Sequence, residues 1–257
     1  MSPRGPRRRT GCLVLGLLAL GLAIGFGVWW SSPGVDLGPW RQGPLPLRWA
    51  SWERQEAVWQ RQGLHRHPEH SYLPIEEISG ELVLAVLVGE DISYFGHGAV
   101  DPRAVWEVLK EWREEGRLRG ASTISQQVAK MLFLSGERSL SRKLQEARLA
   151  YWIERRLGKR RVLEIYLNVV EFGPGLFGAE AAAQHYLGTS ARVLSAKEAA
   201  AVAAAIPAPG RDNPDTGTSK WEFRRDTIAK RLQRVAWLRV ILARHQAGPA
   251  LPTAPPR

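Results

Sequence analysis

A run of twenty residues near the N-terminus, from Gly11 to Trp30, contains no charged side chain. A helix rises about 1.5 Å per residue, so a run of this length matches the roughly 30 Å hydrocarbon core of a bilayer. Trp29 and Trp30 stand at its end, where indole rings favour the membrane interface. The run therefore predicts a transmembrane helix over 11–30, which constrains where every later residue can lie.

The ten residues before this run carry four arginines and no acidic residue. Basic residues beside a membrane span favour the cytoplasmic side, so we expect a cytoplasmic tail over 1–10 and a single pass through the membrane. The rest of the chain is then expected outside the cytoplasm. A cleaved signal peptide is the alternative, but its apolar region is usually shorter, and WWSSPG is a poor cleavage sequence.

The charge of the chain indicates an acidic partner. The net charge is +11, and +7 remains when the four arginines of the first ten residues are set aside. Nucleic-acid phosphates, an anionic membrane surface or a phosphorylated substrate would each suit such a chain. A location outside the cytoplasm disfavours nucleic acid. The single cysteine, Cys12, excludes an internal disulfide.

Composition divides the remaining chain into three parts. Residues 31–70 are rich in Pro, Gly, Trp and Arg and predict a juxtamembrane linker, with a short amphipathic helix near 50–62. From 71 to 245 nearly every segment has the helical period, and strands do not alternate with helices, so we expect one mainly α domain. The Pro-rich residues 246–257 are expected to be disordered.

Three histidines in the predicted linker, His65, His67 and His70, raise the question of a metal site. Pro68 interrupts them, and apart from Glu69 no cysteine or acidic partner has ligand spacing. A solvated basic linker is therefore the favoured interpretation, and no metal-ligating residues are predicted.

Local signals place several helix ends. Asp101 followed by Pro102 predicts a helix that begins at Pro102, and Gly116 predicts its end. Ser79 is a candidate cap for the helix that follows it, and a last helix is expected near 219–244. The domain is thus expected to be a succession of helices.

The segment 172–188, FGPGLFGAEAAAQHYLG, has glycines in the G-x-G-x-x-G spacing of dinucleotide-binding proteins. That motif needs a buried strand before it, whereas the residues before Gly173 have a helical period. Pro174 also stands inside the phosphate loop that the motif would need. We reject the oxidoreductase interpretation and expect the glycines to permit a tight turn and close packing of the Ala-rich helix.

The stretch 90–101, EDISYFGHGAVD, places Glu90 and Asp91 just after an apolar helix, with His97 and Asp101 nearby. A carboxylate that emerges from apolar surroundings suits a general base near neutral pH. The alternative is a helix-ending turn with solvated acidic residues, and the stretch alone does not separate the two.

The stretch 119–134, RGASTISQQVAKMLFL, has one polar stripe at helical spacing, formed by Thr123, Gln126, Gln127 and Lys130. Hydroxyl, amide and ammonium groups that face one way suit a ligand with sugar and phosphate groups. Ile124 and Val128 belong to the opposite stripe, which is expected to face the core. A solvated helix face is the alternative, although such a face would more often carry Glu and Lys.

Residues 136–161 hold nine cations and three acidic residues. Glu146 lies four residues after Arg142 and three after Lys143, so on a helix it can pair with both. The alternative is a basic patch toward the membrane, or a surface ladder of ion pairs that each contribute roughly tenths of a kcal/mol.

In this order the stretches resemble the monofunctional biosynthetic peptidoglycan glycosyltransferases (glycosyltransferase family 51), whose domain also forms half of the bifunctional penicillin-binding proteins. The family's first motif, Glu-Asp-x-x-Phe-x-x-His-x-Gly-x-Asp, is similar to residues 90–101, with Tyr94 and Ala99 as departures. Its second motif, Gly-Gly-Ser-Thr-Ile-x-Gln-Gln, is similar to residues 120–127, with Ala121 as a departure.

The family's third motif, Arg-Lys-x-x-Glu, is matched by Arg142, Lys143 and Glu146. A fourth is similar to RRVLEIYLN, and the glycine-containing segment 172–188 resembles the family's next segment. The resemblance covers about residues 73–210, and its motifs occur in the family's order.

The resemblance implies a lysozyme-like, mainly helical glycosyltransferase domain over 71–245 that polymerises lipid II outside the cytoplasm. In that reaction the 4-hydroxyl of the acceptor attacks the anomeric carbon of the donor, and undecaprenyl pyrophosphate leaves. The resemblance implies Glu90 as the general base and Glu146 as a second catalytic carboxylate, which orients cations or assists the donor. It implies substrate-binding roles for Asp91, His97, Ser122, Thr123, Gln126, Gln127, Lys130, Arg138, Arg142 and Lys143. A divalent cation (Mg²⁺ or Mn²⁺) that accompanies the pyrophosphate is left open.

The implied partners are lipid II, the growing glycan chain, the cell inner membrane through residues 11–30, and cell-wall synthesis or division proteins. No Ser-x-x-Lys sequence occurs in the chain, so no transpeptidase activity is expected. Two other functions stay open: a lysozyme-like lytic enzyme that acts on peptidoglycan, and a membrane-anchored scaffold that binds glycan or lipid without catalysis.

Overall fold

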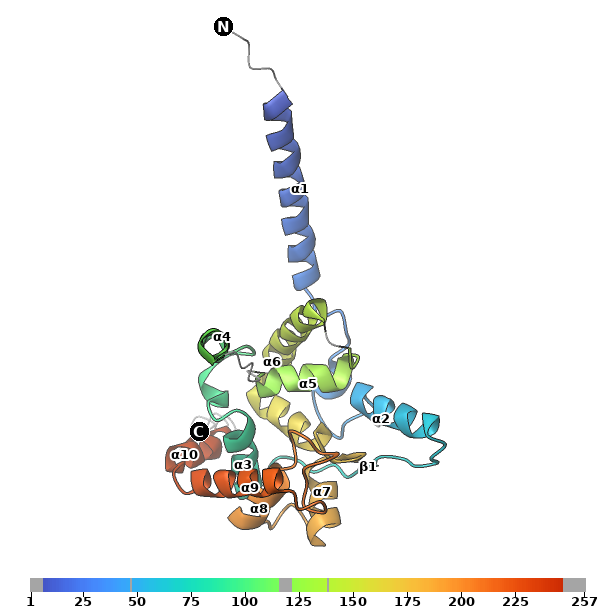
Figure 1. Cartoon of the computed structure of the whole chain (residues 1–257), viewed down its shortest axis with the longest axis vertical. Helices are drawn as coiled ribbons and strands as arrows, with labels where there is room; N and C mark the ends of the chain where they lie inside the picture. The colour runs from blue at the N-terminus through green and yellow to red at the C-terminus, as the bar shows by residue number, and fades with distance from the viewer. Residues whose placement is uncertain (1–6, 47, 116–121, 138, 247–257) are drawn as a thin grey trace, which may run out of the picture. The chain divides into compact units, whose positions relative to one another are not determined.

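The structure is a computed structural model of the whole chain, and it describes residues 7–46, 48–115, 122–137 and 139–246 (Figure 1). The chain forms two compact units, 1–36 and 37–257. The smaller unit holds α1 (Arg7–Trp30), a helix of 24 residues. Within the described part of the chain, no helix combines the length and the apolarity that crossing a membrane requires. The transmembrane helix over 11–30 stays a prediction.

Most of the predicted linker belongs to the larger unit. It contains the short helix η1 (Gly38–Trp40), the helix α2 (Ala50–Arg61) and the strand β1 (Glu69–His70). The helix expected near 50–62 is α2. Trp40, Trp49 and Trp59 are buried, and Trp49 packs edge-on against Phe177 with ring centroids 5.6 Å apart. Because these rings bury a large apolar area, the segment from 37 onward is part of the folded domain and not a solvated linker.

The core is built around α3 (Gly80–Glu90), in which every residue from Leu82 to Val88 is buried. It packs against α8 (Ala196–Ala203) and α9 (Ser219–Leu232), and the three helices lie together in Figure 1. A helix that is apolar on all sides must be covered all round. Thus α3 lies in the interior, and its last residue, Glu90, is where the chain leaves the core.

Three further helices carry the polar motifs: α4 (Pro102–Glu115), α5 (Ile124–Phe133) and α6 (Leu140–Val169). The start of α4 is as predicted, because Asp101 Oδ1 accepts hydrogen bonds from the backbone N–H groups of Arg103 (2.9 Å) and Ala104 (3.3 Å). α5 and α6 pack against each other. α6 bends at Gly158, whose φ of 75° is accessible to glycine without strain.

A small three-stranded sheet joins distant parts of the chain, with β1, β3 (Leu176–Phe177) and β2 (Glu171–Gly173) in that order. β1 runs parallel to β3, and β2 runs antiparallel to it. The sequence pattern does not predict strands of this length. Gly175 stands in the turn between β2 and β3 at a φ of 71°, and a Cβ there would lie 2.1 Å from Trp59 Cη2. The predicted tight turn is confirmed. Close packing of the Ala-rich helix is confirmed at Gly178, just before that helix, where an added Cβ would lie 2.8 Å from the carbonyl oxygen of Asn168.

The remaining chain is helical. α7 (Ala179–Leu187) follows the sheet, as the Ala-rich pattern predicts. The last helix, expected as one element near 219–244, is two helices, α9 and α10 (Ala236–Gln246). Ser79 precedes α3 but does not cap it, because its hydroxyl donates to the carbonyl of Leu194 (2.7 Å).

Candidate active site

Glu90 lies in the last turn of α3, and 11% of its side chain is exposed. Its Oε2 accepts a hydrogen bond from Gln127 Nε2 (3.0 Å), and its Oε1 accepts one from Arg224 Nη2 (2.6 Å). Arg224 also donates to the carbonyl of Gly89 (2.9 Å). A carboxylate oxygen has two lone pairs, so each oxygen can accept a further hydrogen bond. The carboxylate is thus oriented by α5 and α9 and stays partly open to solvent.

The amide of Gln127 is held in turn by Tyr166. The hydroxyl of Tyr166 donates to Gln127 Oε1 (3.0 Å), and the tyrosine is fully buried. Burial, together with the nearby charge of Glu90, raises the pKa of Tyr166 well above its usual range. Tyr166 therefore stays protonated and keeps donating, which directs the Nε2 group of Gln127 toward Glu90.

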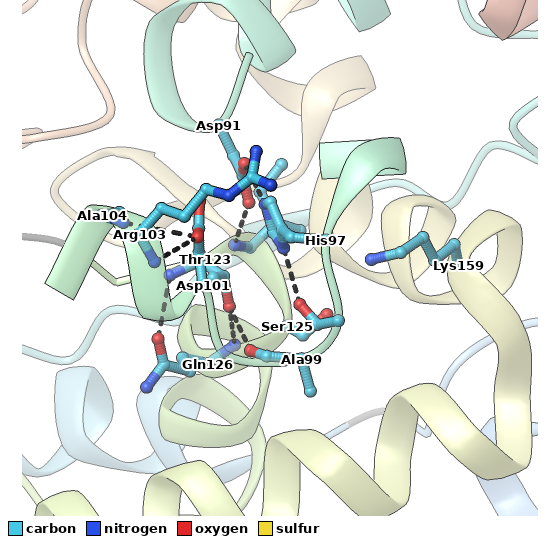
Figure 2. Close-up of polar contacts among 12 residues, drawn as sticks. Asp91, His97, Ala99, Asp101, Arg103, Ala104, Thr123, Ser125, Gln126 and Lys159 are labelled. Atoms are coloured by element: carbon cyan, nitrogen blue, oxygen red, sulfur yellow. Dashed lines mark hydrogen bonds and ion pairs between the residues drawn. The ribbon is translucent and has the colours of Figure 1, made fainter. Parts of the chain in front are cut away.

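Asp91 and His97 form a buried pair directly after Glu90 (Figure 2). His97 Nε2 lies 2.8 Å from Asp91 Oδ1, and Asp91 Oδ2 accepts a hydrogen bond from the backbone N–H of Ile124 (3.1 Å). The side chains of His97 and Asp91 are 8% and 6% exposed. The pair ties the segment 90–101 to the N-terminus of α5, where a negative charge is favourable. Both side chains make internal contacts here, and their substrate-binding role stays a prediction.

The Asp91–His97 pair should make stability depend on pH. The hydrogen bond to Asp91 raises the pKa of His97 above its usual value of about 6.5, although burial opposes the shift. The resulting stabilisation is fully present below about pH 6.5 and is lost as pH rises through the higher pKa of the folded state. We expect the free energy of unfolding to fall over this range, and to fall less in His97→Gln.

Urea unfolding at several pH values between about 6 and 8.5 measures this dependence. His65→Gln is the matched control, because His65 is exposed, and it should keep the pH profile of the parent protein. A His97→Gln variant with that same profile would show that the pair does not cause it.

Thr123 and Gln126 form the cap of α5. Thr123 Oγ1 accepts a hydrogen bond from the backbone N–H of Gln126 (3.2 Å), and Gln126 Oε1 accepts one from the N–H of Thr123 (3.1 Å). The hydroxyl of Thr123 also donates to the carbonyl of Ala99 (2.6 Å), as Figure 2 shows. Both side chains are buried. The polar stripe predicted at helical spacing thus begins with two side chains that cap the helix, and the substrate-binding roles of Thr123 and Gln126 stay predictions.

Removal of this cap should destabilise the protein. Thr123→Ala deletes the acceptor at the start of α5 and leaves the carbonyl of Ala99 without its donor. We expect the free energy of unfolding, measured with denaturant, to fall by about 1–3 kcal/mol. Thr227→Ala, inside α9, is the control and should change stability by roughly 0.5 kcal/mol or less. Equal losses in the two variants would contradict the capping role.

Glu146 lies on α6 with 3% of its side chain exposed, and it pairs with two cations. Its Oε2 accepts a hydrogen bond from Arg142 Nη1 (3.1 Å), and its Oε1 pairs with Lys143 Nζ. Lys143 Nζ also donates to Ser122 Oγ (2.9 Å), which joins α6 to the segment before α5. The pairing expected from the helical spacing is confirmed. Arg138, which belongs to the same predicted set, lies outside the described residues.

Lys130 approaches this cluster from α5. Lys130 is exposed as a whole, but desolvation lowers the pKa of its ammonium group, and Glu146 opposes that shift. The pKa is lowered further by the positive charges of Lys143, Arg142 and Arg54. Among the described residues, no hydrogen bond or ion pair engages the ammonium group of Lys130. It is therefore a cation held among other cations without a partner of its own.

α5 connects the carboxylate of Glu90 with the cluster of cations that includes Lys130, Arg142 and Lys143. Gln127, which contacts Glu90, and Lys130 are three residues apart, so they share a face of the helix about 4.5 Å apart along its axis. One face of α5 thus carries the hydrogen-bond partner of Glu90 and a cation of the cluster. The arrangement can accept a proton at one end and bind an anion at the other.

Two arginines of the site belong to none of the predicted motifs. Arg224 comes from α9, 134 residues after Glu90, and Arg54 comes from α2, within the predicted linker. The chain has 36 lysines and arginines, and neither spacing nor local composition distinguishes these two. Only the packing of α9 on α3 and of α2 on α5 brings them to the site.

The part of the chain that the structure describes contains no group of three or more His, Cys, Asp and Glu side chains placed to hold a metal ion. Of the histidines in the predicted linker, His67 Nδ1 lies 3.4 Å from Glu56 Oε1. The ring of His70 packs against Trp49, with centroids 5.2 Å apart.

The family model described as Transglycosylase matches residues 56–233 of the chain. A protein from Herminiimonas arsenicoxydans, named biosynthetic peptidoglycan transglycosylase, is 43% identical over 180 residues, which cover 70% of this chain and 78% of that protein. A protein of the same name from Bordetella pertussis is 45% identical over 179 residues and covers 66% of this chain and 74% of its own length. One from Aeromonas hydrophila is 44% identical over 172 residues, with 66% and 68% covered.

Proposed function

The chain belongs to the transglycosylase family, and from this premise we propose that it is a peptidoglycan glycosyltransferase that polymerises lipid II into glycan strands. The observation that carries the proposal is the arrangement along α5. Glu90 contacts Gln127 on this helix, and Lys130, one turn later, belongs to a cluster of cations. A carboxylate beside a group of cations suits a reaction in which a hydroxyl attacks and a diphosphate leaves.

Glu90 is the proposed general base. The 4-hydroxyl of the acceptor sugar must lose its proton as it attacks the anomeric carbon of the donor, and a positioned carboxylate typically contributes about 10²–10⁴-fold to such a step. Arg224 and Gln127 hold the two oxygens of Glu90 and leave a lone pair on each. These contacts would fix the direction in which the carboxylate accepts the proton.

The cations are the proposed site of the leaving diphosphate. Its negative charge increases as the bond to the donor sugar breaks, so preformed positive groups stabilise the transition state more than the ground state. Among the described residues, the ammonium group of Lys130 has no hydrogen-bond or ion-pair partner. Arg142 and Lys143 are held in place by Glu146. In this proposal Glu146 orients the cations.

A lytic enzyme is the nearest alternative. Cleavage of a glycosidic bond requires an acid that protonates the leaving sugar oxygen. Glu146 accepts contacts from two cations and is 3% exposed, so it is arranged as an ionised partner of Arg142 and Lys143 and not as a proton donor. The site therefore favours diphosphate departure over glycan cleavage.

Incubation of the purified full-length protein with labelled lipid II separates the candidate functions. The proposal predicts long glycan polymer together with released undecaprenyl pyrophosphate. Shorter fragments from added glycan strands would indicate lysis. Binding of lipid II without any product would indicate a scaffold.

We also propose that residues 11–30 anchor the enzyme in the inner membrane, with 1–10 in the cytoplasm and the domain over 71–245 outside it. The support is the uncharged run of twenty residues behind an arginine-rich tail. In cell fractionation the full chain should sediment with membranes and resist extraction by carbonate. Release of the full chain by carbonate would contradict the anchor.

A further inference from the structure

Arg54 is a cation at the edge of the proposed site that no motif includes. It lies on α2, two residues before the segment that the family model matches. Its Nη1 donates to the carbonyl of Leu134, the residue directly after α5 and one turn after Lys130. The side chain also passes Gly136, where an added Cβ would lie 3.5 Å from Arg54 Cδ. The guanidinium is therefore held at the same end of α5 as Lys130.

The electrostatics place Arg54 within the cation cluster. Burial lowers the pKa of Arg54, and the positive charge of Arg142 lowers it further, against the opposing effect of Glu171. Arg54 in turn lowers the pKa of Lys130. The charges of the two arginines and the lysine thus influence one another.

The cluster has more positive than negative charge. Four cations, Arg54, Lys130, Arg142 and Lys143, stand against two carboxylates, Glu146 and Glu171, which leaves an excess of two positive charges. Like charges in a partly desolvated region are unfavourable unless an anion binds between them. A diphosphate group carries the charge that this excess would balance.

The guanidinium of Arg54 also has N–H donors that are not used within the described residues. A guanidinium has five N–H donors, and within the described residues the one hydrogen bond of Arg54 is that to Leu134. Its planar group suits phosphate oxygens, which it can bind through two parallel hydrogen bonds.

We propose that Arg54 is a fourth cation of the diphosphate-binding surface, supplied by α2 from outside the matched family segment. The inference rests on the proposed function, because the ligand is the diphosphate of the lipid substrate or of the released product. Arg54 binds this group together with Lys130 and Arg142. α2 then belongs to the binding site itself, although it lies in the predicted linker.

A purely structural role for Arg54 gives a different expectation. A cation near the last carbonyls of a helix stabilises that helix, so Arg54 could serve only to fix the end of α5. In that case its replacement lowers stability and leaves anion affinity unchanged. The two roles separate when stability and anion affinity are measured on the same variant.

The test uses the full-length protein in detergent and inorganic pyrophosphate as the probe, with binding measured by calorimetry. Arg54→Gln is the main variant, because it removes the charge and keeps a polar side chain. We expect its pyrophosphate affinity to fall about tenfold, the usual effect of one lost charged hydrogen bond. Arg54→Lys should recover part of the affinity. Arg61→Gln, at an exposed position of the same helix, should bind as the parent does.

Parent-like pyrophosphate affinity in Arg54→Gln would overturn the inference, whatever its melting temperature, and so would an Arg61→Gln variant that loses as much. A parent protein that does not bind pyrophosphate would overturn it as well. The lipid II assay on the parent tests the proposed function separately. Polymer formation by the parent with unchanged pyrophosphate affinity in Arg54→Gln would therefore reject the role of Arg54 alone.

Discussion

Glu90→Gln is expected to lower the rate of lipid II polymerisation by about 10²–10⁴-fold. Glutamine keeps the size of the side chain and can still accept a hydrogen bond from Arg224, but it cannot take a proton from the acceptor hydroxyl. Single-turnover assays with labelled lipid II measure the chemical step. Because the change does not remove a cation, the affinity for lipid II should stay close to that of the parent.

The matched control for this variant is Glu222→Gln. Glu222 is an exposed glutamate on α9, two residues before Arg224, and its replacement should leave turnover unchanged. Thermal unfolding of both variants shows whether any loss of rate reflects loss of fold. A folded Glu90→Gln that polymerises lipid II at the parent rate would remove Glu90 from the role of base.

Lys130→Ala is expected to lower turnover by about 10²–10³-fold, the usual effect of deleting one group that stabilises charge in a transition state. It should not lower stability. Burial and neighbouring cations lower the pKa of Lys130, which means that the folded state disfavours its charge. The expected result is a slow enzyme with an unchanged or raised melting temperature.

Lys197→Ala, at an exposed lysine on α8, is the control for this pair of measurements and should change neither turnover nor melting temperature. Full activity in Lys130→Ala would show that the leaving diphosphate does not depend on this cation. A melting temperature well below that of the parent would show that Lys130 is structural.

Features of the sequence that act over a few residues predict the structure well. Asp101 caps α4 as its position before Pro102 indicates, because the cap is set by neighbours in the chain. Glu146 contacts Arg142 and Lys143 because helical geometry alone places residues three and four apart together. The continuous apolar segment before Glu90 forms the buried helix α3, because a helix that is apolar on all sides needs to be covered.

Features that depend on tertiary packing could not be predicted from spacing. Spacing alone does not show that Thr123 and Gln126 cap α5. The structure shows the cap, and the hydroxyl of Thr123 also contacts the carbonyl of Ala99, 24 residues earlier. The contacts of Arg224 with Glu90 span 134 residues, and no periodic pattern connects the two.

The predicted linker was the largest difference between sequence and structure. Its content of Pro, Gly and Arg indicates a solvated segment, but three of its four tryptophans, Trp40, Trp49 and Trp59, are buried in the domain. Trp59 packs so closely on Gly175 that no other residue fits there without a shift, and this contact links α2 to the turn between β2 and β3. Composition reports the average of a segment, whereas a few aromatic rings determine where it packs.

The central claim is that an ionised carboxylate at position 90 removes the acceptor proton beside a cluster of cations. The most direct test is one turnover measurement on three proteins at a single pH: the parent, Glu90→Asp and Glu90→Gln. Aspartate keeps the charge on a shorter side chain, whereas glutamine keeps the length and loses the charge. We predict that the parent is fastest, that Glu90→Asp is slower, and that Glu90→Gln is the slowest of the three. Polymerisation by Glu90→Gln at or above the rate of Glu90→Asp would contradict the claim.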